Sequence, residues 1–187
     1  MRGNEATRSS DFGKHLRYAT NVTTSVSNKE RLNRWFCAFR MTADKPVLGF
    51  GPGTYMFQYG PYQMPQDLTR ISSYHGERGG AHSEYLKVLT ESGFPGLLMW
   101  LGAIITAIIS GTRVVYNAAS RDLRWMATLV IAGLVGYLAH GVVNNFSHTA
   151  KIAVLLWGAV AFLVAMDTRL RPYYQTLKAE GRYRQPL

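Results

Sequence analysis

Three stretches of the chain decide its fold: Pro95–Gly111 (PGLLMWLGAIITAIISG), Trp125–Val143 (WMATLVIAGLVGYLAHGVV) and Ile152–Met166 (IAVLLWGAVAFLVAM). None of them contains Asp, Glu, Lys or Arg. A helix needs roughly 20 mostly apolar residues to cross the hydrocarbon core of a bilayer. The first stretch meets this requirement with its uncharged flanks, and the second meets it as well, although it carries His140 near one end. The third is shorter. It spans if its helix starts near His148 and Lys151 snorkels, and is otherwise a buried or re-entrant hairpin.

We therefore expect an all-α membrane protein in which an outer helical and loop segment precedes about three transmembrane helices. The expected division is an outer segment at 1–91, a transmembrane region at 92–166 and a basic tail at 167–187. The expected spans lie at about 95–113, 125–144 and 148–166. A single cysteine among 187 residues excludes a disulfide framework and a multi-cysteine zinc site.

Basic residues beside the apolar stretches predict the orientation of the chain. Arg113, Arg121 and Arg124 follow the first stretch, and five Lys or Arg residues follow the third. Short basic loops stay cytoplasmic, so 1–91 and the loop at 144–150 should face the periplasm. Because the tail adjoins a membrane span, we interpret its charge as a contact with anionic membrane lipids, not a nucleic-acid site.

Local patterns predict two helices and a tight loop in the outer segment. Ser27 and Glu30 have the spacing of a capping box, and the helix that follows should end before Pro46. Its apolar residues at helical spacing are Leu32, Trp35, Phe36 and Phe39. The glycines of LGFGPG (48–53) predict a tight loop. A second helix should begin near His82, stop at Gly93 and lead through Pro95 into the first span.

Three residues of the outer segment are candidates for acid–base chemistry and for phosphate binding: His82, Arg31 and Arg34. In the first turn of a helix, backbone N–H groups and the helix dipole disfavour a protonated imidazole, which leaves His82 available as a neutral base. The two arginines offer planar donors suited to phosphate. The alternative is that the arginines form a solvated helix face and His82 is an ordinary N-terminal helix residue.

Four motifs occur in order ahead of the first span: Arg31-x3-Trp35, Pro46-x2-Gly49-x-Gly51-x-Gly53, Ala81-His82-Ser83-Glu84-Tyr85-Leu86 and Glu91-Ser92-Gly93-x-Pro95-Gly96. In this order the chain resembles the O-antigen ligase and polymerase family. The resemblance covers residues 28–112 well and continues more loosely through HGVVNNFSHTAK (140–151).

The resemblance implies a multi-pass glycosyltransferase of the GT-C type in the bacterial inner membrane, with its active face in the periplasm. Its donor would be an undecaprenyl-diphosphate-linked glycan. Its acceptor would be the lipid A core for a ligase, or another glycan acceptor, such as a lipid-linked repeat, for a polymerase. No metal or other cofactor is implied.

Residue roles carried over by motif assign two catalytic groups. His82, from the H-x3-L pattern, corresponds to the base for the acceptor hydroxyl, and Arg31, from the R-x3-W pattern, to the partner of the donor diphosphate. Arg34, Glu84 and Tyr85 are the candidate substrate-binding residues. Members of the family have more spans, so we expect this chain to be a C-terminal portion that works with an N-terminal membrane half. The alternative is a truncated, non-catalytic remnant or accessory protein.

Two polar clusters are further candidate sites, one for a metal ion and one for substrate. His75, Glu77, His82 and Glu84 could be ligands of a metal, but their spacing matches no zinc signature, and we expect no metal there. His140, Asn144, Asn145 and His148 lie at the outer end of the second span. They are either interfacial anchors or part of a substrate cavity.

Overall fold

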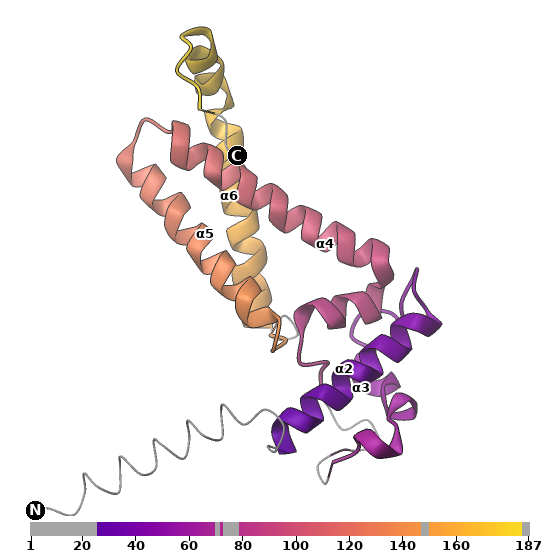
Figure 1. Ribbon diagram of the computed structural model, residues 1–187. Coiled ribbons are helices and arrows are strands. Elements are labelled where there is room, and N and C mark those ends of the chain that lie inside the picture. The colour runs from indigo at the N-terminus through magenta and orange to yellow at the C-terminus, as the bar shows by residue number, and fades with distance from the viewer. Residues whose placement is uncertain (1–25, 70–71, 73–78, 147–149, 185–187) are drawn as a thin grey trace, which may run out of the picture.

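The computed structural model describes residues 26–69, 72, 79–146 and 150–184, and within these ranges the regular structure is helical, without strands. An outer part holds α2 (Val26–Asp44), α3 (Tyr55–Gln58) and the 3-10 turns η1 (Gly60–Tyr62) and η2 (Pro65–Asp67). Three long helices follow: α4 (Glu84–Asn117), α5 (Arg121–Gly141) and α6 (Ala150–Ala179). Figure 1 shows the outer part lying beyond one end of the long helices. The predicted fold class is confirmed.

All three long helices are long and apolar enough to cross a membrane. From Pro95 to Asn117, α4 is about 35 Å long at 1.5 Å per residue, enough for a hydrocarbon core of about 30 Å. α6 is one continuous helix, so the re-entrant hairpin considered for the third apolar stretch is wrong. It also extends to Ala179, well into the expected basic tail.

The long helices pack around small and branched side chains. α4 and α5 form an antiparallel hairpin, and α6 crosses against it (Figure 1). The buried apolar residues between them are Ala107, Val114, Ala118, Ala127, Leu134, Leu156 and Leu163. Gly111 lies where the three helices meet, because a Cβ there would come within 2.9 Å of Ile131 and Leu163. Such a small residue lets membrane helices approach closely.

α4 is broken near its start, as the sequence predicts. Gly93 has φ 68° and ψ −174°, a conformation essentially confined to glycine, and Pro95 begins the second segment. The first segment therefore belongs to the outer part, and the second enters the bundle at an angle (Figure 1).

The break in α4 interlocks with the glycine loop after α2. The backbone N–H groups of Phe50 and Gly51 donate to the carbonyls of Thr90 and Glu91 at 3.0 and 2.9 Å, and that of Phe94 donates to Pro46 at 2.8 Å. A Cβ on Gly49 would meet the Glu91 backbone, and one on Gly93 would meet the Val47 carbonyl. Two motifs that are about 40 residues apart in the sequence thus form one backbone junction.

The predicted helix before Pro46 is confirmed, but its capping box is wrong. Ser27 already lies within α2, and the Glu30 carboxylate bonds to Arg34, Thr69 and Ser72. The buried face of α2 carries Cys37, Ala38 and Met41, which pack against Tyr55, Tyr59 and Ala81 in the outer part. The apolar side chains of Leu32, Phe36 and Phe39 are exposed.

Candidate functional site

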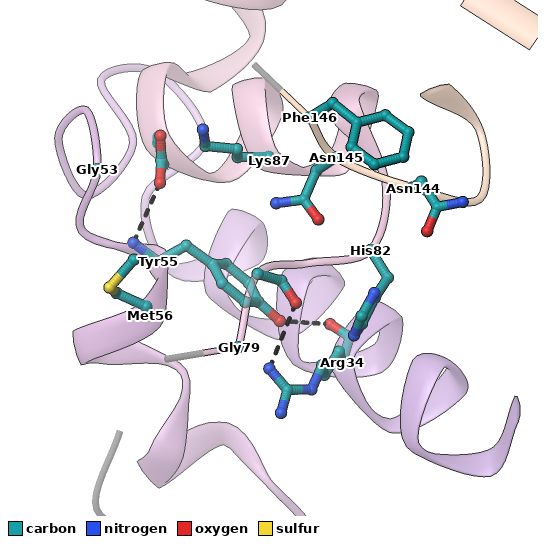
Figure 2. Close-up of a pocket in the computed structure, with 12 residues that line it drawn as sticks. Arg34, Gly53, Tyr55, Met56, Gly79, His82, Lys87, Asn144, Asn145 and Phe146 are labelled. Carbon is teal, nitrogen blue, oxygen red and sulfur yellow. Dashed lines mark hydrogen bonds between the residues drawn. The ribbon is translucent and has the colours of Figure 1, made fainter. Parts of the chain in front are cut away.

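A cavity of about 440 Å³ lies where the outer part meets the α5–α6 connection. Figure 2 shows side chains from five stretches around it. α2 supplies Arg34, and the first segment of α4 supplies Lys87 and Glu91. The other lining residues are Gly53, Tyr55 and Met56 around the start of α3, Gly79, Gly80 and His82 before α4, and Asn144, Asn145 and Phe146 after α5.

His82 is held at the cavity in an unusual backbone conformation. Its φ is +51°, unlike any other non-glycine residue described. The Trp35 indole N–H donates to the His82 carbonyl at 3.3 Å, so the tryptophan of the R-x3-W motif holds the histidine of the next motif. The prediction that His82 lies in the first helical turn is wrong. Ser83 is the N-cap, its hydroxyl accepts from the Leu86 N–H, and His82 precedes it.

The environment of His82 favours the neutral imidazole. Burial lowers the pKa of His82 below 6.5, and the positive charges of Arg34 and Arg31 lower it further, against a smaller opposite effect of Glu30. The sequence predicted a neutral imidazole because of the helix dipole, whereas in the structure burial and two arginines produce it. At neutral pH His82 is thus able to accept a proton.

Arg34 is fixed by partners on several sides. Its Nε donates to Glu30 at 3.0 Å, its Nη1 donates to the Gly80 carbonyl at 3.4 Å, and its guanidinium lies 5.0 Å from the centre of the Tyr59 ring. Hydrogen bonds from Ser72 and Thr69 and the charge of Arg34 outweigh the effect of burial and lower the pKa of Glu30. The charge of Arg34 is therefore largely balanced within the fold.

Arg31 differs from Arg34 in its position and in its partners. It does not line the cavity, yet its positive charge lowers the pKa of His82. Among the residues that the structure describes, its guanidinium has no hydrogen bond or ion pair. Arg31 lies one turn before Arg34 on α2, and its cation remains available to an anion that approaches His82.

Two glycines shape the wall between Arg34 and Asn145. A Cβ on Gly79 would coincide with the Arg34 guanidinium, and one on Gly80 would overlap the Asn145 amide. The pair Gly79-Gly80 directly before Ala81-His82 was a signal of close packing that the sequence motifs did not include.

Glu84 and Tyr85 bond to α5 and to the connection that follows it. The Glu84 carboxylate is buried and accepts a hydrogen bond from the Phe146 backbone N–H, and the Tyr85 hydroxyl donates to the Leu138 carbonyl at 3.0 Å. Neither lines the cavity. Glu84 instead fixes the connection that carries Asn144 and Asn145, and Tyr85 fixes the part of α5 that leads into it.

Lys87, to which no role was assigned from the sequence, also lines the cavity, one turn beyond Ser83 on α4. Tyr55 lines it too: its hydroxyl donates to the Arg34 carbonyl at 2.7 Å and its N–H donates to Glu91 at 3.2 Å. Lys87 could have been found from its helical spacing to Glu91. The sequence offered Tyr55 only as one of several aromatic residues for packing or for stacking on sugars, because its hydrogen-bond partners lie more than 20 residues away. Of the cluster after the second span, Asn144 and Asn145 line the cavity and His140 bonds Asn144 at 3.1 Å.

Three other residues named from the sequence, His75, Glu77 and His148, lie outside the described residues. Within the described ranges, no three His, Cys, Asp or Glu side chains are grouped so that they could hold a metal ion.

Comparison with known proteins identifies one family. The O-antigen ligase family matches residues 6–101, just over half of the chain, which includes all four motifs and every described part of the cavity wall except the α5–α6 connection. No curated protein and no solved structure matches the chain. With its three apolar helices, the chain is a membrane protein that belongs to the O-antigen ligase family.

Proposed function

We propose that the chain takes part in glycan transfer from an undecaprenyl-diphosphate-linked donor to the lipid A core, at the periplasmic face of the inner membrane. The observation that carries this proposal is a neutral histidine in a cavity with cations around it, at one end of a membrane-spanning bundle. Family membership supports the reaction class, because O-antigen ligases are glycosyltransferase-type enzymes.

In this proposal His82 is the general base. Its neutral imidazole accepts the proton of an acceptor hydroxyl, and the oxygen attacks the anomeric carbon of the donor sugar. The bond between that carbon and the diphosphate oxygen breaks, and the lipid diphosphate leaves with the electron pair. The buried, partly apolar surroundings that lower the pKa of His82 keep it in the reactive form at neutral pH.

The leaving group gains negative charge, which nearby cations stabilise. We assign the diphosphate to Lys87, which lines the cavity, and to Arg31, whose charge acts on His82 and which has no partner among the described residues. Arg34, which Glu30 already balances, contributes mainly by lowering the pKa of His82 and by shaping the wall. Glu84 and Tyr85 enter as positioning residues that hold the Asn144–Asn145 wall.

Two alternatives remain, a polymerase that extends another lipid-linked glycan and a non-catalytic remnant or accessory protein. Product identity separates all three. The chain is expressed together with an N-terminal membrane half from an O-antigen ligase, in cells that lack their own ligase and polymerase, and membranes are supplied with the lipid-linked glycan and either acceptor. Glycan on the lipid A core supports the ligase, longer lipid-linked glycan supports the polymerase, and no product with either acceptor contradicts both.

The role of His82 is tested in the same assay. A general base contributes about 10²–10⁴-fold, so His82→Ala should reduce transfer by about 100-fold or more while the chain still inserts into the membrane. Gln58→Ala, an exposed position on α3 outside the cavity, is the matched control and should transfer normally. A normal rate in His82→Ala would contradict the base role.

A further inference from the structure

A second cavity, of about 460 Å³, lies at the other end of the bundle, far from His82. The C-terminal end of α4, the start of α5 and the last turns of α6 surround it, and the segment after α6 closes it. Figure 1 shows α6 extending past the α4–α5 hairpin at this end, with the final segment turning back toward α4. The lining residues that matter here are Arg124, Arg182, Arg184, Tyr116, Tyr173 and Asn117.

The turn that closes this cavity is a specific structure. Gly181 adopts φ +68°, and the Arg182 N–H donates to the Leu177 carbonyl at 2.8 Å. The Tyr183 ring then lies 5.7 Å from that of Tyr174, and the Lys178 ammonium lies 4.9 Å from the centre of the Tyr183 ring. Together these contacts return the chain along α6, as a Schellman-type glycine ending does.

Asn117 fastens the returning segment to α4. Its Nδ2 donates to the Arg184 carbonyl at 2.8 Å, and its Oδ1 accepts from the Arg184 N–H at 2.8 Å. Asn117 is only 5% exposed, so this pair of bonds is shielded from water. The clamp holds the Arg184 guanidinium at the cavity, although the residue lies near the C-terminus.

The cavity is strongly basic. Of the residues that the structure describes, three arginines and no acidic residue line it, and one of these arginines, Arg182, pairs with Glu180 at 3.0 Å. Arg124 donates through Nε to the Ala118 carbonyl at 2.6 Å, and among the described residues its other guanidinium nitrogens have no partner. Guanidinium groups grouped in this way suit a phosphate, which they bind in bidentate fashion.

The position of the cavity indicates the source of the phosphate. It lies where α4 ends, at the boundary of the membrane-spanning region, and Tyr116 and Tyr173 are exposed beside it. Tyrosines at this level are typical of the membrane interface, where lipid headgroups lie. We propose that this cavity binds the phosphate headgroup of an anionic phospholipid in the leaflet opposite the His82 site.

The test uses the purified full chain in a neutral detergent, with phosphatidylglycerol or phosphatidylcholine added and bound lipid counted by native mass spectrometry. We expect phosphatidylglycerol to remain bound at concentrations about tenfold below those needed for phosphatidylcholine. The double variant Arg182→Gln/Arg184→Gln should lose that preference. Arg169→Gln/Arg171→Gln removes the same charge from exposed positions of α6 outside the cavity and should keep it.

An equal loss in both double variants would overturn the site, because the preference would then come from net charge alone. Equal binding of the two lipids by the unaltered chain would overturn it as well. Asn117→Ala separates the clamp from the charges: it retains every arginine, yet it should weaken the preference for phosphatidylglycerol because Arg184 is no longer held at the cavity. An unchanged preference in this variant would contradict the clamp.

Discussion

At the scale of single residues, His82 is controlled by groups from two other motifs. Trp35 holds its carbonyl, and Arg34 and Arg31 act on its ring through their charges. A lowered pKa means that the imidazole stays neutral until the pH falls below its ordinary value of 6.5. A base that must be neutral to act therefore loses activity only at a pH more acidic than an unperturbed histidine would require.

The pKa of His82 can be measured directly by NMR titration of the detergent-solubilised chain, with His82→Asn used to assign the signal. We expect a value below 6.5, and Arg31→Gln should raise it toward 6.5 because one of the two repelling charges is removed. Arg40→Gln is the matched control: Arg40 lies on the same helix but pairs with Asp67, so the pKa of His82 should not change. A value at or above 6.5 in the unaltered chain would contradict the described surroundings of the ring.

At the scale of elements, the junction between the glycine loop and the break in α4 joins the outer part to the bundle. Gly93→Ala should lower the free energy of unfolding by about 1–3 kcal/mol. Alanine rarely adopts the backbone conformation of Gly93, and its Cβ would meet the Val47 carbonyl. Gly102→Ala, in the same helix with no atom near its Cβ, should change stability by less than about 1 kcal/mol. Denaturant unfolding in detergent measures both, and equal stability of the two variants would contradict the junction.

Helices and their ends were predictable from the sequence where neighbouring residue types determine them. The three long helices follow from stretches without charge, and the break at Gly93 follows from a glycine two residues before a proline. The inward face of α2 was not predictable from apolar spacing, because Phe36 and Phe39 are exposed while the smaller Cys37 and Ala38 are buried.

The candidate site was predictable only in part, since many of its contacts join distant residues. Motif order indicated His82 and Arg31, and Arg34 was added from its place on the same helix, but neither signal could tell that Arg34 is balanced by Glu30 and that Arg31 is not. Glu30 has the spacing of a cap residue, and its actual partners, Thr69 and Ser72, lie about 40 residues further on. Lys87 reaches the cavity only because α4 is broken after it and its first segment turns toward α2.

At the scale of the whole molecule, the two cavities lie at opposite ends of the same bundle, one beside a histidine and one beside three arginines. The orientation predicted from basic loops places the first in the periplasm and the second in the cytoplasm. The single cysteine makes this orientation convenient to test. Cys37 is fully buried, and burial raises the pKa of its thiol to about 11, so it should react slowly with thiol reagents.

New cysteines at exposed positions therefore report which face they occupy, against a low background. Gln58→Cys lies on α3 in the outer part, and Ala179→Cys lies at the end of α6. In spheroplasts, a membrane-impermeant maleimide should label Gln58→Cys, whereas Ala179→Cys should be labelled only after the membrane is permeabilised. The unaltered chain is the control for Cys37 and should remain largely unlabelled in both conditions.

Three spans require the two positions to lie on opposite faces, so labelling of both before permeabilisation would contradict the number of spans. The reverse pattern would preserve the spans and contradict the orientation, and with it a periplasmic site for glycan transfer.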